Sequence, residues 1–296
     1  MKNEKKTVRL VYPQWQGGVN PDYVFGSRLL AFLAPGNTQD ETVEIPVTED
    51  FETPLAQVDG VDGGDVLLSQ MEETSRILKE KDPDHVIVFG GDCAVSQRPF
   101  DFLRGKYGEN MGIIWMDAHP DIATVKTSSH LHEMVLGNLI GLGGASEVTR
   151  VEHPVEPEKV IFAGLIEPDL REMDMAVRTL SMAVAGPEKL AYDSAPVLDW
   201  IRKNHIAYVA VHFDLDVLTP VDFRSIYPAE PYCRDFGAAI GALTLKQVGR
   251  ILQDVSGQAE LVGLTVAEHL PWDAFRLREM LAGIPIFGNK GGCTET

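Results

Sequence analysis

Hydrophobic and polar positions follow two repeating patterns along the chain. Short runs of five to eight mostly apolar residues are typical of strands that are buried on both faces of a sheet. The runs are continuous rather than alternating, which favours parallel over antiparallel pairing. They predict strands at residues 7–12, 43–47, 85–89, 112–116, 160–165, 206–213 and 261–266.

The longer segments between these runs place apolar residues at helical spacing. Within 65–81, for example, Val66, Leu67, Met71 and Ile77 recur at roughly helical intervals among polar and charged residues. The same pattern predicts helices at residues 23–33, 65–81, 96–107, 134–142, 168–180, 195–204, 245–255 and 272–281.

Two local features refine this prediction. Thr244 immediately precedes the helix predicted at 245–255. Gln247 lies three residues after Thr244, which is the spacing of a capping box. Segment 217–239 is irregular and punctuated by prolines. Its length is typical of a lid or a pocket wall.

Strands and helices alternate almost throughout, which predicts the α/β fold class. We expect a three-layer αβα sandwich with a mostly parallel central sheet. The sequence contains no internal repeat, low-complexity tract or linker, so residues 1–296 are predicted to form one domain. Ligands of such sheets bind beyond the carboxyl ends of the strands.

Candidate metal ligands follow three of the predicted strands. Asp117, His119 and Asp121 come directly after the strand at 112–116. Side chains at alternating positions of extended chain point the same way, so these three groups can converge. Two other predicted strands lead into Gly90-Gly91-Asp92-Cys93 and Asp214-Leu215-Asp216.

Convergence of these carboxylates would require cations. Asp117, Asp121, Asp214 and Asp216 would repel one another strongly at short range, and two divalent ions would balance their four charges. Oxygen-rich ligation with some imidazole favours a hard ion such as Mn²⁺. The chemistry that such a site implies is metal-assisted hydrolysis.

The net charge of the chain limits the classes of partner that it can bind. A formal net charge of −18 argues against nucleic acid and anionic membranes and favours a small cationic substrate. Cys93, Cys233 and Cys293 are odd in number and widely spaced, which predicts reduced thiols in a cytoplasmic protein. No run of about 18 apolar residues is present to span a bilayer.

The ordered motifs resemble those of the arginase/agmatinase (ureohydrolase) superfamily. Its Gly-Gly-Asp-His, Asp-Ala-His-x-Asp and Asp-x-Asp motifs and its late Glu correspond here to 90–93, 117–121, 214–216 and Glu268, within a similarity that covers about 85–270. The resemblance implies an arginase-like fold and a hydrolase of linear amidines. The implied reaction converts arginine, N-hydroxyarginine or a related guanidino compound to urea and an amine.

The resemblance also implies a ligand set for two divalent ions, in which Asp117 and Asp214 bridge the metals. Manganese is the ion expected first, with Zn²⁺ or another softer ion as an alternative at Cys93. The implied metal ligands are Cys93, Asp117, His119, Asp121, Asp214 and Asp216. Family members are commonly trimers or hexamers, so a homo-oligomer is expected.

Further roles follow from the same resemblance. Asp121 would orient the attacking hydroxide, His132 would protonate the leaving amine, and Glu268 would receive the guanidinium group. Asp169, with Glu172 as a second acid, would lie near the substrate's amino group.

Several positions depart from the family pattern. Cys93 stands where a histidine ligand is usual, and His130 flanks His132 where Asn is common, which should reshape the outer substrate pocket. His212 occupies a position where a small residue is usual, and Thr219 replaces an aspartate. Two alternatives therefore stay open: a catalytically silent arginase-like binding or assembly protein, and a formimino or amide hydrolase of the same fold.

Overall fold

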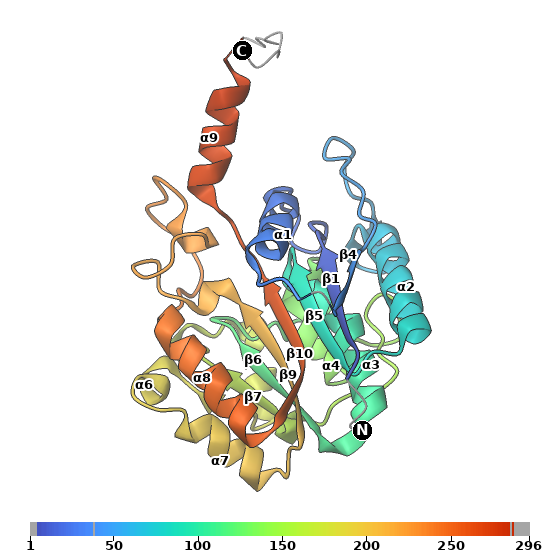
Figure 1. Cartoon of the computed structure of the whole chain (residues 1–296), viewed down its shortest axis with the longest axis vertical. Coiled ribbons are helices and arrows are strands. Elements are labelled where there is room, and N and C mark those ends of the chain that lie inside the picture. The colour runs from blue at the N-terminus through green and yellow to red at the C-terminus, as the bar shows by residue number, and fades with distance from the viewer. Residues whose placement is uncertain (1–4, 38, 285, 287–296) are drawn as a thin grey trace.

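The computed structural model of the chain describes residues 5–37, 39–284 and 286. One eight-stranded sheet has the order β2-β1-β5-β10-β9-β6-β7-β8, and every neighbouring pair in it is parallel (Figure 1). The strands are β1 Thr7–Tyr12, β2 Glu41–Glu44, β5 His85–Gly90, β6 Met111–Met116, β7 Val160–Ala163, β8 Ala183–Ala185, β9 Tyr208–Asp214 and β10 Glu260–Ala267. Two-residue strands, β3 Gln57–Val58 and β4 Val61–Asp62, form a separate antiparallel pair.

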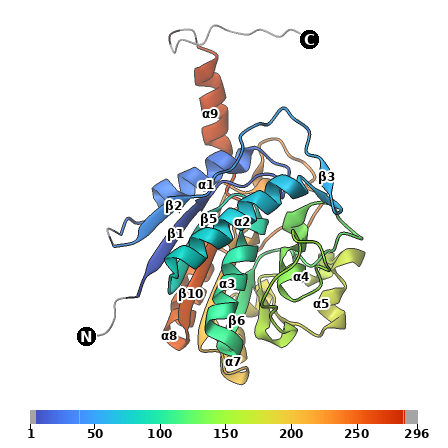
Figure 2. The ribbon, with the colours of Figure 1, turned by 90° about the vertical axis from the view of Figure 1, so that its right-hand side faces the viewer.

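Helices cover both faces of the large sheet. Helices α2, α3 and α4 lie on one face and α7 and α8 on the other, while α9 projects from the body of the protein (Figures 1 and 2). The predicted three-layer αβα sandwich is therefore confirmed. The helices are α1 Asp22–Leu33, α2 Gly64–Lys81, α3 Gln97–Tyr107, α4 Val135–Leu139, α5 Ala176–Thr179, α6 Pro187–Leu190, α7 Ala195–Lys203, α8 Leu245–Gln258 and α9 Trp272–Ala282.

Strand β6 shows why the apolar runs are continuous. Its Ile113 and Trp115 belong to the hydrophobic cluster under α2 and α3, whereas Ile114 and Met116 belong to the cluster under α7 and α8. All four side chains are fully buried. Each contributes roughly 1.5–3 kcal/mol of burial free energy, so both faces of the strand must be apolar.

The prediction of one helix over residues 168–180 is wrong. The chain instead forms two 3-10 turns, Glu167–Asp169 and Glu172–Asp174, and then the four-residue helix α5. The Asp174 carboxylate accepts a hydrogen bond from the backbone N–H of Arg171 at 2.9 Å. Such local side-chain bonds compete with helical hydrogen bonding and explain the break.

Other predicted elements differ at their ends. The strand predicted at 43–47 lies at Glu41–Glu44, because Pro46 lacks the N–H that would continue the ladder. The helix predicted at 134–142 ends at Leu139, before Gly141 with its φ of +86°. Strand β8, only three residues long, was not predicted.

The predicted capping box of α8 is confirmed. Thr244 Oγ1 accepts a hydrogen bond from the Gln247 N–H at 3.3 Å, and Gln247 Oε1 accepts one from the Thr244 N–H at 2.8 Å. No helix within the described ranges is both long and apolar enough to cross a membrane.

Gly91 fixes the carboxyl end of β5 against its neighbours. Its N–H donates to the Tyr12 carbonyl at 2.9 Å, and its carbonyl accepts from the Glu268 N–H at 2.7 Å. A Cβ at this position would lie only 1.7 Å from the Gln14 carbonyl oxygen. Only glycine therefore allows this close backbone approach, which positions the residues that follow β5.

Gly91→Ala should lower the free energy of unfolding by about 3 kcal/mol or more, because the added methyl group has no space. Gly249 in the middle of α8 is the matched control, since a Cβ there meets nothing within 4 Å. Gly249→Ala should raise the free energy of unfolding by about 0.5–1 kcal/mol. Urea denaturation of both variants measures the difference, and equal effects would contradict the close approach at Gly91.

Candidate metal centre at the carboxyl edge of the sheet

Four adjacent strands in the middle of the sheet end at the candidate site. In sheet order these are β5, β10, β9 and β6, although β10 is the last of them in sequence. Cys93 follows β5, Glu268 follows β10, Asp214 ends β9, and Asp117 follows β6. The parallel register thus brings four separate motifs to one edge, as expected for ligand binding in such sheets.

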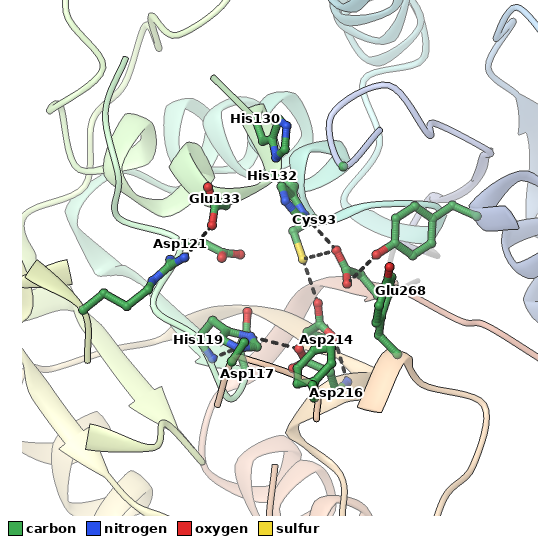
Figure 3. Close-up of a pocket in the computed structure, with 16 residues that line it drawn as sticks. Cys93, Asp117, His119, Asp121, His130, His132, Glu133, Asp214, Asp216 and Glu268 are labelled. Atoms are coloured by element: carbon green, nitrogen blue, oxygen red, sulfur yellow. Dashed lines mark hydrogen bonds and ion pairs between the residues drawn. The ribbon is translucent and has the colours of Figure 1, made fainter. Parts of the chain in front are cut away.

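The site borders a cavity of about 260 Å³. Figure 3 shows the Cys93 thiol and the carboxylates of Asp214 and Glu268 pointing toward one another in this cavity. It is lined by Gly18, Tyr23, Cys93, Asp117, His119, Asp121, His130, His132, Glu133, Arg171, Asp214, Asp216, Tyr227, Phe236, Ala238 and Glu268.

Three overlapping groups of side chains place their ligand atoms within 4.8 Å of one another. Asp117, Asp214 and Asp216 each belong to two groups, so the groups form one continuous cluster. The groups are Cys93 with Asp117, His212 and Asp214; Asp117 with His119 and Asp216; and Asp214 with Asp216 and Glu268.

Burial makes the negative charges of this cluster unfavourable. Burial and the neighbouring Asp216 raise the pKa of Asp117 to about 7. Burial and nearby carboxylates also raise the pKa values of Asp121 and Asp214 well above their usual range. The carboxylates therefore need positive charge nearby in order to ionise fully at neutral pH.

The neighbours of Cys93 and Asp216 shift the pKa values of these two groups in opposite directions. Burial, followed by the charges of Asp214 and Glu268, raises the pKa of the Cys93 thiol well above its usual range. For Asp216, the opposing effect of burial is outweighed by the His119 imidazole, whose Nδ1 lies 2.9 Å from an Asp216 carboxylate oxygen, and the pKa is lowered. His119 is thus one cation beside several acids.

The donor set fits divalent metal ions. Buried polar atoms without a hydrogen-bond partner among the described residues include Nε2 of His119, Oδ2 of Asp121 and Nε2 of His212. Unsatisfied buried atoms of this kind are uncommon in folded proteins, and a bound ion would satisfy them. Carboxylates, imidazole and one thiol are all ligands of first-row divalent metals.

Glu268 is held in place by three side chains. The Tyr23 hydroxyl donates to Glu268 Oε2 at 2.7 Å, His132 Nδ1 lies 3.1 Å from Oε1, and Cys93 Sγ lies 3.5 Å from Oε1. The backbone of Glu268 has a φ of +62°, a conformation that non-glycine residues rarely adopt. Strain at this position turns the carboxylate toward the cavity.

The structure separates the remaining predicted site residues. Asp121 and His130 line the cavity, but Asp121 belongs to none of the three ligand groups. Asp169 lines a neighbouring cavity of about 400 Å³, which shares Arg171 with the first. Glu172 is exposed and lines neither cavity. The roles of these residues stay predictions.

Several lining residues were not predicted. Tyr23 reaches the site from the first turn of α1, and Arg171 extends from the segment where the predicted helix is absent. The Arg171 guanidinium pairs with Glu133 at 2.7 Å and with Asp174 at 3.0 Å. The only indication of Arg171 in the sequence was a basic residue between two acids, Asp169 and Glu172.

The wall function predicted for segment 217–239 is confirmed, because Tyr227, Phe236 and Ala238 line the cavity. Cys93 and Cys233 are free thiols, one buried and one exposed. Cys293 lies outside the described residues.

His212, a member of the first ligand group, is fully buried. Its ring stacks on Trp115 with centroids 3.8 Å apart and an interplanar angle of 9°. Its Nδ1 lies 2.7 Å from Ser96 Oγ. Burial lowers the pKa of His212 to about 3, so the ring is neutral and one nitrogen carries a lone pair.

The chain is thus an α/β protein with a parallel sheet and a buried cluster of acidic, imidazole and thiol groups at its carboxyl edge that could hold metal ions. The family model described as "Arginase family" matches residues 35–276. The chain therefore belongs to the arginase family, which confirms the resemblance seen in its motifs.

Curated relatives agree with this assignment at low identity. The arginase of Bacillus subtilis (strain 168) is 27% identical over 203 residues, which cover 63% of this chain and 64% of that protein. The match thus spans less than two thirds of the relative's length.

Solved structures show the same fold. The arginase from Bacillus cereus has a TM-score of 0.72 and 18% identity over 90% of this chain and 91% of its own. The proclavaminate amidino hydrolase from Streptomyces clavuligerus has a TM-score of 0.65 and 20% identity over 90% of this chain and 84% of its own. At these identities the likeness is one of fold.

Metal binding should stabilise the protein, and more strongly as pH rises. The carboxyl groups of Asp117 and Asp214 have raised pKa values in the folded, metal-free chain, so folding takes up protons between about pH 4 and about pH 7. Their contribution to stability therefore falls as pH rises through this window. A metal ion competes with those protons, so its stabilising effect should grow over the same window.

Thermal denaturation with Mn²⁺ or with a chelator, at about pH 5.5 and about pH 8, measures this effect. At 100 times its dissociation constant, the metal should add about 2.7 kcal/mol, or roughly 5 °C in Tm. Asp117→Asn is the matched variant: without metal it should be at least as stable as the native chain, with a smaller metal effect. An equal metal effect in both proteins at both pH values would contradict the site.

Proposed function

We propose that this chain is a metal-dependent amidinohydrolase that hydrolyses a guanidino group to urea and an amine. The observation that carries the proposal is the continuous cluster of ligand atoms beside a cavity at the carboxyl edge of the sheet. Membership of the arginase family supports the reaction class. The names of two relatives, arginase and proclavaminate amidino hydrolase, are consistent with it.

The residues that would hold two divalent ions divide into two sets with shared members. By the resemblance to the family, Asp117 and Asp214 would be shared by the two ions; each belongs to two of the ligand groups, as Asp216 also does. Cys93 and Asp121 would complete the first site, and His119 and Asp216 would complete the second. The chemistry that such ions supply, Mn²⁺ foremost, is Lewis-acid activation of a water molecule for attack on the guanidinium carbon.

Glu268 would bind the guanidinium group of the substrate. Its Oε2 is held by Tyr23 and its Oε1 faces His132 and Cys93. A carboxylate oriented in this way can accept charge-assisted hydrogen bonds from a planar cation. Asp121, whose Oδ2 is buried without a partner among the described residues, would orient the attacking water.

His132 would protonate the departing amine. Burial lowers its pKa, but the hydrogen bond to Glu268 outweighs that effect and raises the pKa above its ordinary value. The raised pKa favours the protonated ring, which can give up its proton to a leaving nitrogen. His132 lines the cavity beside Cys93 and Glu268, at the edge of the ligand cluster (Figure 3).

The outer part of the substrate would contact residues at the cavity mouth. His130 lines the cavity, and Asp169 lies in the adjoining one, so both are candidates for contacts to the substrate's far end, with exposed Glu172 as a second acid. The buried negative charge favours a cationic compound such as arginine, N-hydroxyarginine or a related guanidino compound.

Further parts of the proposal rest on sequence features and on the family. We place the protein in the cytoplasm because of its cysteine usage and treat residues 1–296 as one domain because no linker interrupts them. The family suggests a homo-oligomer, a trimer or a hexamer.

One observation favours a second candidate function. Cys93 replaces a usual histidine ligand, which suits a catalytically silent binding or assembly protein, or a hydrolase of formimino or amide compounds.

Urea release from a panel of guanidino compounds by the Mn²⁺-loaded protein tests the proposed reaction. Urea should form from at least one of arginine, N-hydroxyarginine, agmatine and the guanidino acids. His132→Asn should lower kcat by about 100-fold or more, because it removes the proton donor. Asp117→Asn should lower the amount of bound metal and abolish turnover.

His85→Gln is the control, since His85 lies at the opposite end of β5 and pairs with Glu260; its turnover should equal that of the native chain. Two metals per chain without urea from any compound would favour formimino or amide substrates. Failure to bind metal would favour the silent relative.

A further inference from the structure

We infer that His212 is a metal ligand, and that its Nε2 replaces the imidazole that Cys93 displaces from the first site. The first site would then be a Cys-His-Asp-Asp set made of Cys93, His212, Asp117 and Asp214. Asp121, which belongs to none of the ligand groups, would then only orient the attacking water and would not complete this site. The inference rests on the metal centre of the proposed function and assigns a residue that the motif pattern leaves out.

The strand geometry places His212 beside the cluster. His212 precedes Asp214 by two positions on β9, so both side chains lie on the same face of the sheet. Trp115 and Asp117 have the same spacing at the end of β6, and Trp115 is the register partner of His212. One ring nitrogen of His212 lies within 4.8 Å of the ligand atoms of Cys93, Asp117 and Asp214.

The two contacts of the imidazole fix its orientation and leave one nitrogen free. Trp115 stacks on the ring, and the Trp115 indole N–H also donates to Asp117 Oδ2 at 3.1 Å. Ser96 Oγ lies 2.7 Å from Nδ1 and can accept a hydrogen bond from the Nδ1–H group. In that tautomer the lone pair is on Nε2, the arrangement that metal-binding histidines require.

The free nitrogen needs a partner. Nε2 of His212 has none among the described residues, and the side chain is 0% exposed, so bulk solvent does not reach it. A buried polar atom without a partner costs roughly 1–3 kcal/mol. A histidine that served only to pack against Trp115 would carry this penalty, whereas a bound ion removes it.

The resulting donor set differs from that of the second site. A thiolate and an imidazole with two carboxylates form the mixed sulfur, nitrogen and oxygen set that Zn²⁺ or Co²⁺ binds in tetrahedral geometry. The second site, with His119 and Asp216, is richer in oxygen. The chain should therefore bind a softer ion at the first site and a harder one at the second.

X-ray absorption of the full chain loaded with one equivalent of Zn²⁺ tests the ligand set directly. The native protein should show one sulfur neighbour at about 2.3 Å and imidazole nitrogen at about 2.0–2.1 Å. Co²⁺ should give a sulfur-to-metal charge-transfer band that is lost in Cys93→Ser. His212→Gln should remove the imidazole signal and lower Zn²⁺ affinity by about 100-fold or more, beyond the loss expected for an outer-shell contact.

Two further variants separate ligation from packing. Ser96 only orients the His212 ring, so Ser96→Ala should lower Zn²⁺ affinity by about 10-fold. The double variant Cys93→His with His212→Ser moves the imidazole back to the position after β5. Like His212→Ser alone, it keeps three of the four ligands, but with imidazole in place of the thiol its preference should shift from Zn²⁺ toward Mn²⁺. His85→Gln should leave every readout unchanged.

An unchanged imidazole signal and unchanged affinity in folded His212→Gln would overturn the inference. Urea denaturation of the metal-free proteins shows whether the variant is folded; should it fail to fold, Ser96→Ala and the double variant decide. These readouts do not depend on turnover. A chain that binds Zn²⁺ through His212 but releases no urea would refute the proposed function and leave this inference intact.

Discussion

Repulsion between carboxylates buried at one edge of the sheet is the constraint on which the rest of this structure depends. Asp117, Asp214 and Asp216 are almost completely removed from water and lie within a few ångströms of one another. In the metal-free chain, protons on the carboxyl groups with raised pKa values and the charge of His119 offset that repulsion. Bound metal ions would take over this role, with His119 giving up its proton to act as a neutral ligand.

The positions of the ligands could be predicted from the sequence because they depend on local rules. Asp117 and His119 follow a continuous apolar strand, and Asp214 follows another. In a parallel sheet such strand ends meet at one edge, whatever the order of the strands. The fold class followed from the same alternation, and helix α8 was marked by a capping box that the structure retains.

The rest of the site depends on contacts between distant parts of the chain. Tyr23 meets Glu268 across 245 positions of sequence, and nothing local to either residue indicates the pairing. Arg171 reaches the cavity only because its segment is not the predicted helix, a break caused by the side chain of Asp174. For the same reason, Asp169 lines the neighbouring cavity and not the cavity beside the candidate ligands.

Strand β10 occupies the centre of the sheet between β5 and β9, although it follows every other strand in sequence. During synthesis, β5 and β9 must therefore wait with open edges until residues 260–267 are available. Non-local pairing of this kind slows folding and exposes strand edges to aggregation. The same insertion brings Glu268, which follows β10 directly, to the site, so pairing of β10 with β5 and β9 is also what supplies the cavity with this acidic side chain.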